Sequence, residues 1–255
     1  MIFYVFLMRN IMTFRILIIR LLLVSMMMFV TACVSDTSYL YDDVTYGTKD
    51  TLPVSVANLK EMAGYCKRIY DEGKQLSDNE YAYDVVEKNG SSIVIIRGTD
   101  NARNVLTDLE AIPEYDTELS LTVHRGFWNA ALVIKNDLLA NYKLPKNIVF
   151  TGHSMGGAIA QLLGLWFQNK GHEVTIYTFA SPAVTVDLIS QDNHYRVYMK
   201  KDPVPLLPPY PFIHWGIRIN AETLDWDESH PTLDISQSDP RDHSIIEYLS
   251  FLNKH

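Results

Sequence analysis

The chain has 255 residues, of which 47% are hydrophobic and 20% are charged. This is ordinary globular composition, and the length suffices for one large domain with a sizeable core. The formal net charge of -8 argues against a nucleic-acid partner, because no basic stripe is present to neutralise phosphates.

Residues 1–32 are predicted to form a signal peptide. Arg9, Arg15 and Arg20 interrupt an otherwise apolar stretch. The apolar run that follows Arg20 is too short for a comfortable transmembrane helix, but it fits the hydrophobic region of a signal peptide. Initiation at Met8 or Met12 is equally compatible with this pattern.

The signal-like stretch closes with Val30-Thr31-Ala32-Cys33. This tetrapeptide resembles the lipobox of bacterial lipoproteins, in which the cysteine becomes acylated. We therefore expect Cys33 to carry lipid, and Val34 after it favours the outer membrane by resemblance to enteric lipoproteins. A signal peptide with a chance cysteine and an uncleaved anchor are the alternatives. Residues 33–55 are predicted to tether the lipid to a domain over residues 56–255.

Hydrophobic periodicity predicts the elements of this domain in chain order. The expected elements are a helix over 56–70 that stops at Gly73, strands over 81–87 and 93–96 joined by an Asn89-Gly90 hairpin turn, a helix over 127–142, a strand over 148–150, a helix over 156–169, strands over 174–179 and 195–199, and a helix over 244–252. Cys66 lies in the first helix as a small buried hydrophobe. Buried strands alternating with helices predict an α/β fold, a mostly parallel sheet with helices on both faces.

Gly152-His153-Ser154-Met155-Gly156 matches the G-x-S-x-G motif. On its own the match is weak, but here it lies between a predicted strand and a predicted helix. A nucleophile elbow requires this order, because the strand holds the serine Oγ up at the edge of the sheet. The start of the helix also offers N–H groups to a developing oxyanion. We therefore predict that Ser154 is a nucleophile on an α/β-hydrolase fold.

A serine nucleophile needs a base and an orienting acid, which follow it in this fold in the order Ser, Asp, His. Asp202 comes just after a predicted strand, and Pro203 is expected to fix an extended exit; Asp187 is the fallback. His243 precedes the last helix, and it is favoured over its rivals, His214 and His230.

The ordered motifs of residues 57–252 resemble the class 3 lipases, the family that includes the fungal triacylglycerol lipases. The motifs are residues 95–99 (IIRGT), 106–109 (LTDL), 124–127 (HRGF), 152–157 (GHSMGG), 177–182 (YTFASP), 202–209 (DPVPLLPP), 214–216 (HWG) and 242–243 (DH). The resemblance implies that Asp202 is the triad acid and His243 the base, and that His214 is structural. It also implies that the backbone N–H groups of Thr99 and Met155 form an oxyanion hole.

In these lipases the segment after the oxyanion residue is a short amphipathic lid. The resemblance therefore implies a lid over residues 100–109, with Val105, Leu106 and Leu109 as its apolar face. A permanently open site, with these residues packed under the domain edge, is the alternative.

The sequence thus predicts a serine hydrolase of acylglycerol-type esters, held at a membrane through its lipidated N-terminus. No metal or other cofactor is expected, because no Cys/His cluster of suitable spacing is present. No obligate protein partner is evident. A phospholipase A or an acyltransferase with the same triad is the alternative enzyme, and an inactive lipid-anchored envelope protein is the alternative from another class.

Overall fold

The computed structural model describes residues 51–72, 74–75, 81–99, 111–227 and 239–255. Its main feature is an eight-stranded sheet. The strands lie in the order β1 (Lys74–Gln75), β2 (Ala82–Lys88), β3 (Ser91–Ile96), β6 (Asn147–His153), β7 (Glu173–Phe179), β8 (His194–Tyr198), β9 (Ile217–Asn220) and β10 (Trp226–Asp227). Strands β3, β6, β7, β8 and β9 are parallel, and the strands at both edges are antiparallel.

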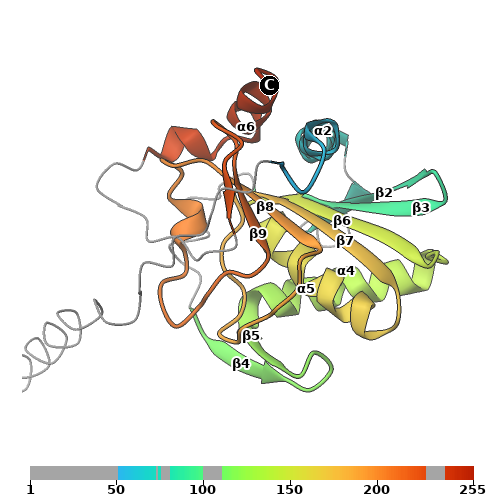
Figure 1. The fold of residues 1–255 in the computed structure, drawn as a ribbon. Helices are drawn as coiled ribbons and strands as arrows, with labels where there is room; N and C mark the ends of the chain where they lie inside the picture. The colour runs from blue at the N-terminus through green and yellow to red at the C-terminus, as the bar shows by residue number, and fades with distance from the viewer. Residues whose placement is uncertain (1–50, 73, 76–80, 100–110, 228–238) are drawn as a thin grey trace, which may run out of the picture. The chain divides into compact units, whose positions relative to one another are not determined.

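Helices cover both faces of this sheet (Figure 1). Helices α2 (Val56–Glu72) and α6 (Ile245–Leu252) pack on one face, and α4 (Arg125–Asn141) and α5 (Met155–Asn169) pack on the other. Strand β3 shows how one strand serves both cores: Ile93 and Ile95 belong to the core under α2 and α6, and Val94 and Ile96 to the core under α4 and α5. Successive side chains of a strand point to opposite faces, so the buried strand predicted over residues 93–96 is confirmed, with both of its faces covered.

The predicted hairpin between β2 and β3 is also confirmed. Its two turn residues, Asn89 and Gly90, have φ angles of 51° and 77°. Positive φ at both central residues is what a type I′ turn requires, and asparagine followed by glycine meets that need at low steric cost. Cys66 is fully buried in α2 as expected, with its Sγ 3.4 Å from Thr151 Oγ1.

Several elements were not predicted. The hairpin of β4 (Pro113–Asp116) and β5 (Leu121–His124) lies before α4, and strands β9 and β10 extend the sheet. The expected extended exit after Pro203 was wrong: Pro203 has φ −74° and ψ −19°, and it caps the short 3-10 helix η2 (Val204–Leu206). A second 3-10 helix, η4 (Pro240–His243), precedes α6. These short segments carry too few residues for a periodicity to be visible.

Hydrogen bonds fasten the β4–β5 hairpin to the helices below the sheet. Trp128 Nε1 on α4 donates to Asp116 Oδ2 at 2.6 Å, and Trp166 Nε1 on α5 donates to Glu118 Oε2. Lys135 Nζ lies 4.7 Å from the Trp166 ring centroid, within the range of a cation–π contact. Within the described ranges, no helix is both long and apolar enough to cross a membrane.

Candidate active site

Ser154 lies at the turn between β6 and α5. Its backbone has φ 58° and ψ −130°, a conformation that residues with a Cβ rarely adopt and that costs on the order of 1–3 kcal/mol. Two features hold the turn in place: the Ser154 N–H donates to Phe179 O at 2.9 Å, and Gly157 N–H donates to Ser154 O at 2.9 Å. The predicted strand–turn–helix setting of Ser154 is thus present, with the serine at the carboxyl end of its strand.

The two motif glycines permit the sharpness of this turn. A Cβ on Gly152 would lie 2.3 Å from the carbonyl carbon of Gly156, and a Cβ on Gly156 would lie 2.2 Å from Ile96 O. Backbone atoms cannot move away as a flexible side chain can. The approach of α5 to β3 and β6 therefore excludes every larger residue at both positions.

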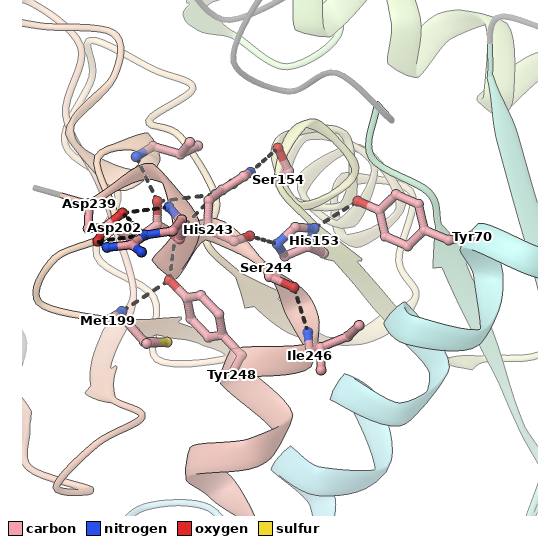
Figure 2. Close-up of polar contacts among 12 residues, drawn as sticks. Tyr70, His153, Ser154, Met199, Asp202, Asp239, His243, Ser244, Ile246 and Tyr248 are labelled. Carbon is pink, nitrogen blue, oxygen red and sulfur yellow. Dashed lines mark hydrogen bonds and ion pairs between the residues drawn. The ribbon is translucent and has the colours of Figure 1, made fainter.

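The structure brings Ser154, His243 and Asp202 into one hydrogen-bonded chain (Figure 2). His243 Nε2 lies 2.9 Å from Ser154 Oγ, and His243 Nδ1 lies 3.1 Å from each carboxylate oxygen of Asp202. The Asp202 side chain is fully buried, whereas 13% of the His243 side chain is exposed. A carboxylate can only accept, so Nδ1 carries the proton and Nε2 is free to accept from the serine hydroxyl.

Asp202 is held by further donors. The Val204 N–H at the start of η2 donates to Oδ1 at 2.9 Å, and the hydroxyl of Tyr248 donates to Oδ2 at 2.8 Å. The Tyr248 oxygen accepts in turn from Met199 N–H at 3.0 Å. Burial and the charge of Asp202 hold the pKa of Tyr248 well above its ordinary value of 10, so this hydroxyl remains a donor. Tyr248 was missed from the sequence, because it appears there only as one apolar position of the last helix.

The rival residues lie in other surroundings. His214 is buried and its Nε2 lies 2.7 Å from Pro205 O, a structural placement. Asp187 accepts from the N–H of Thr122 in β5. His230 lies outside the described residues, as do Cys33 and the three residues of the expected lid face, Val105, Leu106 and Leu109.

Thr99 and Met155, the expected oxyanion-hole residues, lie next to the elbow at Ser154. Gly98 passes so close to the turn that a Cβ on it would lie 3.2 Å from Ser154 Cβ. The next residue, Thr99, has a buried hydroxyl with no hydrogen-bond partner among the residues the structure describes. Met155 is the first residue of α5, and the first N–H groups of a helix have no acceptor within it. An unpartnered hydroxyl on Thr99 and a helix N-terminal N–H on Met155 thus lie beside the elbow at Ser154.

His153, the residue before Ser154, forms a second set of contacts that the sequence did not indicate. Its ring is buried, and it connects Tyr70 of α2 to the backbone of His243 (Figure 2). Burial, and then the nearby His243, hold the pKa of His153 well below its ordinary value of 6.5. In the sequence, the only signal for a role of His153 is its position inside the G-x-S-x-G motif. Among the described residues, no group of three His, Cys, Asp or Glu could hold a metal ion.

Comparison with known proteins gives a consistent result. The family model described as lipase (class 3) matches residues 93–212. The secreted mono- and diacylglycerol lipase 1 of Fusarium solani is 32% identical over 133 residues, which cover 47% of this chain and 40% of that protein. The secreted mono- and diacylglycerol lipase A of Penicillium camembertii is 28% identical over 189 residues, which cover 67% of this chain and 61% of that protein. The match thus spans about half the length of these relatives.

The solved structure of Rhizomucor miehei triacylglyceride lipase is similar in fold. It superposes with a TM-score of 0.57 at 21% identity, over 72% of this chain and 89% of that chain. The matched stretch contains the elbow at Ser154 and ends after Asp202, and the sheet order and two-sided helix layers are those of the α/β-hydrolase fold. Residues 93–212 of the chain therefore match the class 3 lipase family, and the chain shares the fold of the lipase structure.

Proposed function

We propose that the protein is a serine hydrolase that cleaves carboxylic esters of acylglycerol lipids through a Ser154–His243–Asp202 triad. The observation that carries this proposal is the unbroken chain from Ser154 Oγ through both ring nitrogens of His243 to the buried carboxylate of Asp202. Nucleophile, base and orienting acid stand within hydrogen-bond reach of one another, which is the geometric requirement for this chemistry.

The first half of the reaction forms an acyl-enzyme. Ser154 Oγ attacks the ester carbonyl carbon while His243 Nε2 takes its proton. The imidazolium that results keeps its Nδ1–H on Asp202, whose negative charge stabilises it. The tetrahedral intermediate collapses when His243 returns the proton to the leaving alcohol oxygen.

The second half hydrolyses the acyl-enzyme. A water molecule gives a proton to His243 Nε2 as it attacks the acyl carbonyl, and the fatty acid leaves when Ser154 Oγ regains that proton. In both halves the oxyanion forms beside Ser154. The N–H groups of Thr99 and Met155 and the unpartnered Thr99 hydroxyl are the donors we assign to it.

The substrate class rests on the relatives. Two of them are named mono- and diacylglycerol lipases, and the structural neighbour is a triacylglyceride lipase. We therefore propose glycerol esters of fatty acids as the substrate. We also propose that Cys33 is lipidated and holds the domain at the cell envelope. The Val30-Thr31-Ala32-Cys33 box supports the lipidation. More than one acyl chain, as on a processed lipoprotein, is needed for stable anchoring.

The test is hydrolysis of p-nitrophenyl butyrate, of mono-, di- and triglycerides and of phosphatidylcholine. Ser154→Ala, His243→Ala and Asp202→Ala should each lower kcat by about three orders of magnitude, and the losses should be strongly non-additive, because the three residues act as a unit. His255→Ala, at the exposed C-terminus, is the control.

Full activity of Ser154→Ala, or a wild-type protein that neither hydrolyses these esters nor reacts with a fluorophosphonate, would overturn the proposal. Preference for phosphatidylcholine over every glyceride would replace acylglycerols with phospholipids as the substrate class.

A further inference from the structure

The hydrogen bonds of His153 have only one consistent direction. Its Nε2 lies 2.8 Å from the backbone oxygen of His243, and its Nδ1 lies 2.8 Å from the hydroxyl of Tyr70 (Figure 2). A carbonyl oxygen can only accept, so Nε2 carries a proton. In a neutral imidazole Nδ1 then has none and accepts from the tyrosine hydroxyl. The order is therefore Tyr70 O–H to His153 Nδ1, and His153 Nε2–H to the oxygen of His243.

The surroundings of His153 keep it neutral. Only 4% of the residue is exposed, and its ring centroid lies 4.8 Å from that of His243 with the planes at 33°. A proton on His153 would place two imidazolium rings next to each other whenever His243 is charged during turnover. A buried neutral ring avoids this repulsion, so the positive charge that appears on His243 meets the negative charge of Asp202 and no second positive charge on His153.

The backbone of His243 has few other supports. It ends η4, in which no residue is buried. Two backbone hydrogen bonds of this turn are local, from Asp242 N to Asp239 O and from Ser244 N to Arg241 O, and its N-cap residue, Asp239, donates to Lys201 O at 2.8 Å. His153, in contrast, belongs to the end of β6 in the centre of the sheet. Its bond to the carbonyl of His243 therefore ties the exposed turn to the same rigid strand that carries Ser154.

We propose that His153 is a positioning residue for the base: it fixes the backbone of His243 relative to Ser154, and Tyr70 fixes the orientation and tautomer of His153. This inference rests on the proposed function, because positioning has a consequence only if His243 takes the proton of Ser154. Two adjacent residues at the end of β6 then position the reacting groups: Ser154 carries the nucleophile, and His153 holds the base. Small displacements of a catalytic group can lower a rate by about a hundredfold, so this tie should appear in kcat and not in substrate binding.

The experiment measures kcat and KM for p-nitrophenyl butyrate in Tyr70→Phe, in His153→Phe and in the double variant. Tyr70→Phe removes one oxygen and should lower kcat about fivefold, the usual effect of one hydrogen bond. His153→Phe should lower kcat by about thirtyfold or more, with KM within about twofold of wild type. The double variant should equal His153→Phe, because the proposal has Tyr70 act on the base through His153.

The matched control is Tyr65→Phe, which removes a tyrosine hydroxyl from the same helix. That hydroxyl donates to Glu61 Oε1 at 3.2 Å, away from the site, so kcat should be unchanged. Melting temperatures are measured for all variants, and if His153→Phe does not fold, Tyr70→Phe decides alone.

Wild-type kcat in Tyr70→Phe, multiplicative losses in the double variant, or a rise in KM that accounts for the whole loss would overturn the positioning role. These results differ from failure of the proposed function, in which the wild-type protein itself is inactive and does not react with a fluorophosphonate.

Discussion

Replacing Tyr248 with phenylalanine tests whether the buried aspartate depends on its tyrosine partner. The substitution removes one oxygen that takes part in two hydrogen bonds, one donated to Asp202 Oδ2 at 2.8 Å and one accepted from Met199 N–H at 3.0 Å. The residue is fully buried, so water cannot replace that oxygen without a cavity to hold it.

The magnitude follows from these two bonds. A hydrogen bond to a charged group contributes about 1.5–3 kcal/mol, and a buried donor left without an acceptor costs about 1–3 kcal/mol. The two ranges partly describe the same loss and cannot be added in full. We therefore expect a loss of about 2–4 kcal/mol in the free energy of unfolding. For a domain of this size the melting temperature should fall by about 5–15 °C.

Activity should fall as well, because Asp202 orients His243. We expect kcat for a soluble ester to drop about tenfold, with KM unchanged, since the lost bond holds the carboxylate that orients His243 and stabilises the imidazolium formed in the transition state. The pKa of Tyr248 is raised well above 10 by burial and by Asp202. The hydroxyl is therefore protonated across the working range, and the kcat ratio of variant to wild type should not change between about pH 6 and about pH 9.

Differential scanning calorimetry and ester hydrolysis, with Tyr65→Phe as the control, measure these effects. An unchanged melting temperature would show that the bond to Asp202 does not stabilise the fold. A wild-type kcat with a lowered melting temperature would show that Tyr248 supports the core and not the triad.

Two further predictions concern the N-terminus and acid stability. Metabolic labelling with a fatty-acid analogue should be lost in Cys33→Ser, because the thiol is the expected attachment point; labelling that survives the change would rule out the lipobox. Burial lowers the pKa of His124 from 6.5 to about 4, so between these values the unfolded chain binds a proton that the folded protein does not, and stability falls as the pH falls. His124→Asn keeps a side-chain acceptor for Phe127 N–H. Its melting temperature should fall less than that of wild type between about pH 7 and about pH 4.5. Equal decreases in melting temperature would assign the acid sensitivity to other groups.

The sequence determined the features that depend on neighbouring residues. Alternating or helical burial marks each major strand and helix, because a segment must bury one side wherever it finally packs. The same holds for the Asn89-Gly90 turn and for the elbow at Ser154, where Gly152 is required by its close contact with Gly156 four residues later. The family resemblance was equally visible, since its motifs are short and ordered along the chain.

Only the tertiary structure decided which distant side chains meet. His243 contacts Ser154 across 89 residues and Asp202 across 41, and from periodicity alone His214 and Asp187 were open alternatives. The bonds of Tyr248 to Asp202 and of Tyr70 to His153 left no local pattern, because a tyrosine on the buried face of a helix looks the same whether its hydroxyl meets a carboxylate or another acceptor. Periodicity records that a side chain is buried, whereas the identity of its partner depends on how the helices dock on the sheet.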